Sequence, residues 1–481
     1  MLQDLRRVSV AETVARGASF VTVPLLTRAL TPSSFGLYRS VFVVSSLVLT
    51  IRGILNLSTL VEKRLPEMTA DDQASLVAAA AATLGAFVGL SVLVVVAVSV
   101  SGVFDWVAPG IFEFIRSNVL VVCLFVATTA LYQFGLTLSK SLDRFDLYSG
   151  AVLVSEVVFL LAVVGLFFTS LLTAPVALGL YVVARGLSIA ILLWRLSSVL
   201  FARPDFRGLW SSARAISLPL APQTVVKQAQ GKVPDAVVIS AFGTAVFGGW
   251  SVLFTFSTVF QLFSRPFSTM LLPKLSKRLD EGEGIDNLLT RYYRFATVLV
   301  VPMVVGGSLL GTQIVGAVFG PQYRLSELTT ATFLIAFGLQ TLAVPASPVF
   351  VARDDALLDT LTYTVASGLL LGTVALGALF GSITLVAAGY AVQQCTILVV
   401  GLWYQTRYVT SDLPTPSGVV RFGIPAVAMT GFVLTVEQFA QGLLSVVVVV
   451  SASATLYFGA LYGTGVVSKQ DIALVRRFVG G

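Results

Sequence analysis

Histidine is absent from this 481-residue chain, and only two cysteines are present. The chain therefore lacks the commonest general base, metal ligand and neutral-pH switch. Cys123 and Cys395 both fall inside long apolar runs, so we interpret them as small packing residues and expect no disulfide framework. Charged residues are also scarce, at 11% of the chain, which leaves too little polar surface for a water-soluble body of this size.

The sequence is instead rich in apolar residues, which make up 56% of the chain. They form runs of about 20 residues, the length that an α-helix needs to cross a bilayer, and the runs show no alternation with a period of two. We predict an all-α polytopic membrane protein with about fourteen transmembrane helices. The predicted spans are 8–30, 35–57, 74–100, 118–138, 150–170, 174–195, 214–240, 245–272, 293–312, 327–350, 358–380, 382–405, 419–437 and 441–463.

The orientation follows from the lysine and arginine residues between the spans, because cytoplasmic loops retain them. One set of connections holds 22 of the chain's 31 basic residues, and the opposite set holds only Arg28, Arg116 and Arg324. We therefore predict that both termini are cytoplasmic and that the protein lies in the plasma membrane. The net charge of +7 alternates with the spans instead of gathering in one basic domain, which argues against nucleic-acid binding.

The chain also repeats itself. The matching segments are 35–38 with 247–250, 63–65 with 277–279, and Arg144 with Arg353. Six spans separate the members of each pair, an even number, so the two copies share one orientation. We predict two six-helix bundles, residues 1–200 and 201–410, related by a pseudo-two-fold axis along the membrane normal. A terminal helix pair with a short cytoplasmic tail, residues 411–481, follows them.

Charges inside the spans are the strongest functional signal, since each costs about 2.5 to 3.5 kcal/mol at a helix centre. The cations are Arg16, Arg39, Arg52, Arg185, Lys227 and Lys232, and the carboxylates are Glu12, Glu156 and Asp235. Cations therefore outnumber carboxylates by three. The deeper cations should point into the bundle, where they either line a wet cavity or form structural ion pairs. Arg39 and Arg52 lie near span ends and could reach the headgroups.

The seventh span is unusual because it holds Pro219, Pro222, Pro234 and Gly231. Prolines break the helical hydrogen-bond ladder, and freed backbone groups at membrane depth require protein or water beside them. We expect this span to line a polar passage. Lys232 and Asp235 are three residues apart and could pair with each other, which leaves Lys227 as the better candidate to bind an external anion.

The first span has a similar layout, with Arg16, Gly17 and Pro24. Two broken, cationic helices in corresponding halves predict a site between the bundles.

Several segments resemble the Wzx-type polysaccharide transporter family, part of the multidrug/oligosaccharidyl-lipid/polysaccharide exporter superfamily. They are 24–32 (PLLTRALTP), 35–38 (FGLY), 217–222 (SLPLAP) and 271–276 (LLPKLS). The resemblance implies a flippase that moves a polyprenyl-linked glycan to the outer leaflet by alternating access. In such proteins, cavity cations meet the lipid phosphate or pyrophosphate, a role that would fall here to Arg16, Arg185 and Lys227, with Lys232 and Arg52 as further candidates.

Two other classes remain as alternatives. A cation-coupled multidrug exporter of the same superfamily should have an acidic cavity, whereas this chain has more cations than carboxylates in its spans. A membrane-embedded polysaccharide polymerase or glycosyltransferase should have a large external loop, yet the longest one predicted here is residues 101–117. No catalytic or metal-binding motif is present in the sequence. A scaffold without transport activity would have no use for broken, charged helices.

The remaining expectations concern partners and coupling. We expect no cofactor and no metal site, although Glu156 or Asp235 could bind a coupling H⁺ or Na⁺. Ion pairing with Arg185 or Lys232 is the structural alternative for these two carboxylates. The expected partners are the polyprenyl-linked glycan, membrane lipids and glycan-assembly proteins, and we expect the protein to be a monomer.

Overall fold

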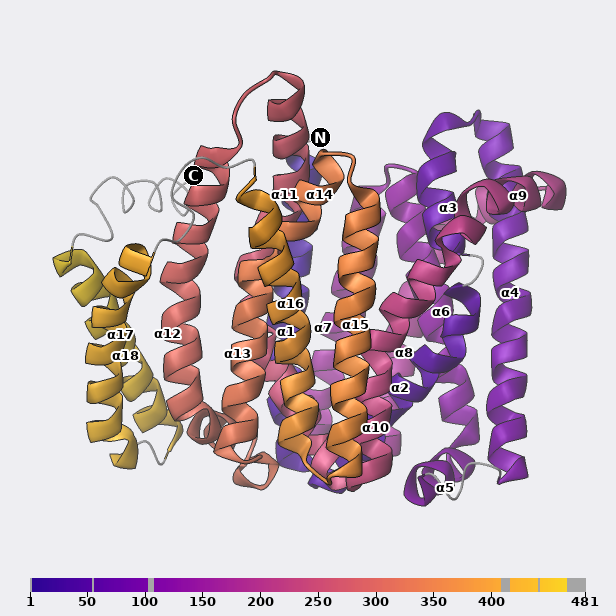
Figure 1. Ribbon diagram of the computed structural model, residues 1–481. Coiled ribbons are helices and arrows are strands. Elements are labelled where there is room, and N and C mark those ends of the chain that lie inside the picture. The colour runs from indigo at the N-terminus through magenta and orange to yellow at the C-terminus, as the bar shows by residue number, and fades with distance from the viewer. Residues whose placement is uncertain (1, 54–55, 103–107, 408–415, 440–441, 465–481) are drawn as a thin grey trace. The chain divides into compact units, whose positions relative to one another are not determined.

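The computed structural model describes residues 2–53, 56–102, 108–407, 416–439 and 442–464, and within these ranges it holds helices and no strand (Figure 1). The chain divides into two compact units, residues 1–248 and 249–481. The predicted all-helical membrane fold is confirmed. The predicted bundle limits at residues 200 and 410 stay predictions. They mark the ends of the repeated halves of the sequence, whereas the two units are defined by their compactness.

The first unit is built from long helices joined by short connections. They are α1 (Leu2–Ala29), α2 (Pro32–Gly53), α3 (Leu57–Arg64), α4 (Ala70–Ser101), α5 (Pro109–Ser117), α6 (Val119–Ser141), α7 (Phe145–Phe167), α8 (Ala174–Leu200), α9 (Phe206–Ser212) and α10 (Leu218–Ser257), whose last residues extend beyond the unit. Local capping sets some of the starts: the Thr69 side chain accepts from the backbone N–H of Asp72 at the start of α4. Within this unit α1 packs closely on α7, and α8 packs on both α6 and α7.

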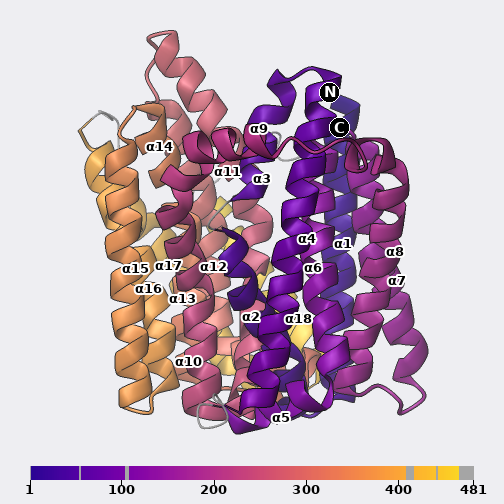
Figure 2. The same ribbon diagram turned by 90° about the vertical axis from the view of Figure 1, so that its right-hand side faces the viewer.

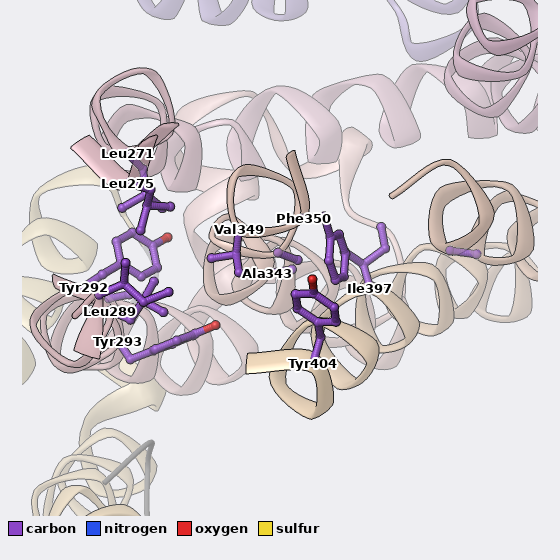
Figure 3. Packing of buried hydrophobic residues seen from close by; sticks show 14 residues of the cluster. Leu271, Leu275, Leu289, Tyr292, Tyr293, Ala343, Val349, Phe350, Ile397 and Tyr404 are labelled. Carbon is purple, nitrogen blue, oxygen red and sulfur yellow. The ribbon is translucent and has the colours of Figure 1, made fainter. Parts of the chain in front are cut away.

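The second unit contains α11 (Val259–Asp280), α12 (Asp286–Val318), α13 (Glu327–Ala343), α14 (Ala346–Ala352), α15 (Ala356–Leu379), α16 (Ile383–Gln405), α17 (Pro416–Val436) and α18 (Leu443–Gly463). Its core gathers buried side chains from α11 to α16, among them Leu275, Leu289 and Phe350 (Figure 3). Residues from α12, α17 and α18 form a separate buried cluster, so the terminal helix pair packs on α12.

Most of the predicted spans correspond to one helix or to part of one, but 245–272 covers the end of α10 and the start of α11, and 327–350 covers α13 and most of α14. By length and apolarity alone, 12 segments of the described residues are candidate membrane spans. Large apolar side chains such as Leu93, Leu161 and Leu444 are exposed on them, as lipid-facing side chains should be. The helix α1 and the first part of α10 are not among the 12. In α1 the charges of Glu12 and Arg16 lower the apolarity of the segment, whereas Lys232 lies within the candidate span 230–262.

Turn geometry supports the internal repeat and corrects one of its pairings. Asp143 and Asp354 both have a left-handed backbone (φ 55° and 62°), and each stands two residues before a helix, α7 or α15. Ser170 and Gly381 are also left-handed, and each lies 27 residues further along its own copy. The equivalent of Asp143 is therefore Asp354, and the predicted pairing of Arg144 with Arg353 is out of register by two residues.

The predicted breaks in the seventh span are wrong in position. The backbone is helical through Pro219, Pro222 and Pro234, and the non-helical residue in α10 is Gly243 (φ 82°, ψ 171°). A positive φ of this kind favours glycine, which has no Cβ to clash with the backbone. Gly243 thus divides α10 between the predicted seventh and eighth spans. A π-helical turn, η2 (Ala213–Ser217), precedes α10 and was not foreseen.

Candidate functional site

Polar side chains in the first unit form two levels along the packed faces of α1 and α7. At the first level Glu12 bridges two groups: its Oε2 lies 3.3 Å from the guanidinium of Arg16, and its Oε1 accepts from the Tyr148 hydroxyl at 3.1 Å. The ammonium of Lys140 lies 4.4 Å from the centre of the Tyr148 ring. Arg16 is therefore ion-paired, but its side chain keeps 30% exposure and can still reach another anion.

The second level is centred on Glu156. This carboxylate accepts a hydrogen bond from the Ser19 hydroxyl of α1 at 3.1 Å, and Arg185 of α8 lies close enough to interact with it electrostatically. Glu156 is eight residues beyond Tyr148 in α7, which corresponds to about 12 Å along a helix axis. The structure thus brings Glu156 near Arg185 and places the Glu12–Arg16 pair roughly two turns away.

Arg185 lies between two tyrosine rings. The carbon at the centre of its guanidinium is 4.3 Å from the ring centre of Tyr181 and 4.8 Å from that of Tyr132. One terminal nitrogen lies 3.4 Å from the Thr129 hydroxyl, and the buried Nε has no hydrogen-bond acceptor within the described residues. A guanidinium stacked on two rings is fixed in orientation while keeping a donor unused.

The internal repeat provides a comparison within the same chain. In the register set by Asp143 and Asp354, Glu156 corresponds to Ser367. For α8 and α16, the exposed Trp194 and Trp403 set the register, and each has an arginine over its ring. Arg185 then corresponds to Gln394. The second copy of the fold therefore forms with uncharged residues at both positions, so the charged pair is not a requirement of the helix packing.

Two of the charged side chains on α10, Lys232 and Asp235, are among the described residues. Lys232 and Asp235 form the expected intrahelical pair, with 4.0 Å between Nζ and Oδ2. One turn earlier, the Thr50 hydroxyl of α2 donates to Gln228 at 2.7 Å. Lys227 and Arg52 belong to α10 and α2, but their side chains lie outside the described residues, so their roles stay predictions. Within the described ranges, no three acidic or cysteine side chains come together as a metal site would require.

The Lys232–Asp235 pair should contribute little to stability. Its side chains are partly exposed and the separation is long, and pairs of this kind are worth about 0 to 1 kcal/mol. We expect Asp235→Asn to shift the melting temperature of the detergent-solubilised protein by less than about 3 °C. A larger loss would mean that the Lys232–Asp235 pair stabilises the fold more than an exposed ion pair does.

Two glycines allow close contact between α2 and α10 in the first unit. A Cβ added at Gly36 would overlap the carbonyl oxygen of Thr244, and one added at Gly248 would overlap that of Pro32. The contacts are reciprocal, because each glycine meets the residue four positions before the other. Both glycines belong to the repeated segments 35–38 and 247–250, so the repeat packs against its own copy here. The contact lies beside the predicted external connections at 31–34 and 241–244.

Several of these residues were not identified by the sequence analysis. Ser19, Tyr132, Tyr148 and Tyr181 carry no charge, so a search for charges in spans passes over them. The glycine contacts had a usable signal, because Gly36 and Gly248 occupy the same position in the two copies of the repeat. A glycine kept at one position of both copies marks a place where the backbones approach each other.

Comparisons with known proteins agree with this architecture. A sequence profile described as "Polysaccharide biosynthesis protein" matches residues 25–327. No curated protein sequence matches the chain.

Among solved structures, the lipid II flippase MurJ in an inward closed conformation is similar, with a TM-score of 0.69 and 14% identity over 95% of this chain and 99% of that one. An inward-facing multidrug resistance MATE family transporter of the MOP superfamily is also similar, with a TM-score of 0.65 and 13% identity. The match covers 84% of this chain and 98% of that one. For the MATE transporter VcmN from Vibrio cholerae, the TM-score is 0.55 and the identity is 15%, over 85% of this chain and 97% of that one. The chain therefore has the fold of MOP-superfamily transporters.

Proposed function

Since the chain belongs to the polysaccharide biosynthesis protein family, we propose that it is a flippase and not an enzyme. It moves a polyprenyl-phosphate- or pyrophosphate-linked oligosaccharide from the cytoplasmic to the outer leaflet of the plasma membrane, for surface polysaccharide or glycoprotein biosynthesis. Both termini are cytoplasmic and the protein acts as a monomer. The fold it shares with MurJ, a lipid II flippase by name, supports this proposal.

The observation that carries the proposal is the state of Arg185. Its guanidinium is oriented by Tyr132 and Tyr181 and keeps a buried donor unused. A lipid phosphate offers charged acceptor oxygens to the terminal nitrogens of a guanidinium, and charge-assisted hydrogen bonds strengthen where water is scarce. The prenyl chain can stay in the bilayer while the headgroup crosses. Arg16 supplies a second cation about two helical turns away in the same unit.

Ion coupling forms a second part of the proposal. Glu156 lies where a proton or Na⁺ bound to it would change the local charge next to Arg185. With Glu156 ionised, Arg185 has an internal counter-charge. With the carboxylate neutralised, the guanidinium is free to attract the phosphate of the substrate. Release of the ion would restore the internal pair and favour release of the substrate.

The multidrug exporter is retained as the alternative because MATE transporters share the fold. An exporter of amphipathic cations needs net negative charge in its passage. The described charges of the first unit instead hold a carboxylate next to each cation, Glu12 beside Arg16 and Glu156 near Arg185. Each of these carboxylates already has a cation beside it, so the two pairs offer no net negative charge to a cationic substrate.

The cationic residues on the two polar helices give the first test. Arg16→Ala and Lys227→Ala should each abolish export of the surface glycan while leaving the protein in the membrane, because a phosphate would lose its counter-charge. Export is measured as glycan at the cell surface, and membrane content by immunoblot. Glu12→Gln is the matched control for Arg16, since it removes the internal partner but keeps the cation. Wild-type glycan levels in both alanine variants would remove these residues from the mechanism.

A further inference from the structure

The connection between α8 and α10 contains a short helix that lies across the end of α4 (Figure 2). In both views α9 runs roughly at right angles to the long helices of its unit, at the same end as α3 (Figure 1). The Asp205 carboxylate caps α9 by accepting from the backbone N–H groups of Arg207 and Gly208, both at 3.1 Å. The backbone N–H of Asp205 donates to the carbonyl oxygen of Ser75 at 3.2 Å, which attaches the segment to α4.

The two sides of this segment differ sharply. Leu209 is buried toward the body of the unit. Three aromatic side chains of the segment are exposed instead: Phe201 at 83%, Phe206 at 52% and Trp210 at 47%. Exposed aromatics grouped on a surface helix are typical of elements that insert at the boundary between headgroups and acyl chains.

The charge of the segment complements an anionic surface. Arg203, Arg207 and Arg214 are all exposed, and the guanidinium of Arg214 lies 5.2 Å from the ring centre of Trp210. The one carboxylate between residues 201 and 214 is that of Asp205, which is engaged in capping α9. Aromatic groups flanked by arginines therefore face away from the protein.

We propose that residues 201–214 bind anionic phospholipid headgroups of the leaflet next to α9. The aromatic side chains enter the boundary region while the three arginines contact lipid phosphates. This inference does not depend on the substrate or on transport. Each basic residue near an anionic leaflet attracts its lipids, so the three together give a clear preference for negatively charged lipid.

Depth in the membrane is tested by site-directed fluorescence. Cys123 and Cys395 are replaced by alanine, Phe206→Cys is labelled with bimane, and the protein is reconstituted in vesicles containing phosphatidylglycerol. We expect strong quenching by a lipid with a nitroxide near the headgroup and weak quenching by aqueous iodide. Glu281→Cys, on the exposed turn between α11 and α12, is the aqueous control. Equal iodide quenching at both sites would overturn the proposal.

Headgroup preference is tested by counting lipids retained on the purified protein by native mass spectrometry. The wild type should retain phosphatidylglycerol over phosphatidylcholine by at least about fivefold. Arg203→Gln/Arg207→Gln/Arg214→Gln should abolish most of that preference. Lys274→Gln/Lys277→Gln/Arg278→Gln removes the same charge from the end of α11 and should preserve it. Equal preference in the two triple variants would overturn the assignment to residues 201–214.

Discussion

We expect Gly36→Ala to lower the stability of the protein by about 3 kcal/mol or more and to abolish glycan export. The added methyl group would overlap the carbonyl oxygen of Thr244, a backbone atom that cannot move aside as a flexible side chain could. Gly248→Ala should have a similar effect, because its methyl group would overlap the carbonyl oxygen of Pro32. The melting temperature in detergent and the amount of surface glycan measure the two consequences.

Gly85→Ala provides the matched control for this substitution. Gly85 lies in α4 of the same unit and has no atom near the position of an added Cβ. Alanine in an open helical position stabilises by up to about 1 kcal/mol, so the control should raise the melting temperature or leave it unchanged. If all three variants melt and export alike, α2 and α10 do not pack through these glycines in the working protein.

We expect Glu156→Gln and Arg185→Gln, made together, to leave a folded protein that does not export glycan. The double substitution removes the charges but keeps amide groups that can hydrogen-bond. The uncharged Ser367 and Gln394 at the equivalent positions of the second copy indicate that the helices pack without the pair. We expect a change in melting temperature of only a few degrees and a loss of surface glycan of at least about 100-fold, since a charge-assisted contact is lost in a site of low polarity.

The single variants separate a structural pair from a functional one. If Glu156 and Arg185 only neutralise each other, each single variant should be inactive and the double variant should regain export. If the charges act on substrate or ion, the double variant stays inactive. Arg185→Lys keeps the charge but not the planar stacking on Tyr132 and Tyr181, so it should retain partial export. Recovery of wild-type export in the double variant would contradict the proposed role of the pair.

The sequence predicted the helices well because span length and apolarity are properties of the local chain. The Lys232–Asp235 pair was predictable for the same reason, since its spacing of three residues places both side chains on one helix face. The Glu12–Arg16 pair has an equally local spacing of four residues. From the sequence Arg16 could either line a cavity or form a structural ion pair, and Glu12 was not named as its partner.

Contacts between distant segments could not be predicted in this way. Ser19 and Glu156 are 137 residues apart, and only the packing of α1 on α7 brings them together. Of the two tyrosines around Arg185, Tyr132 comes from α6 and is brought there by helix packing, whereas Tyr181 has the local spacing of four residues within α8. Arg144 and Arg353 were paired because both are charged, and this pairing was out of register. The residues that do correspond in the two copies are Asp143 and Asp354, which share a left-handed backbone.

The breaks assigned to prolines show a further limit of sequence reasoning. A proline removes one backbone donor, but a helix can continue through it when its neighbours accommodate the ring. In α10 the break lies instead at Gly243, whose positive φ could not be deduced from hydropathy.

The central claim is that the protein moves a lipid-linked anion past Arg185. The most direct measurement uses purified protein in liposomes and follows the transfer of a fluorescent polyprenyl-pyrophosphate-linked sugar between leaflets. We predict that the wild type transfers this lipid, that Arg185→Gln does not, and that neither transports the lipophilic cation ethidium. Transport of ethidium by the wild type, with no transfer of the lipid-linked sugar, would contradict the account.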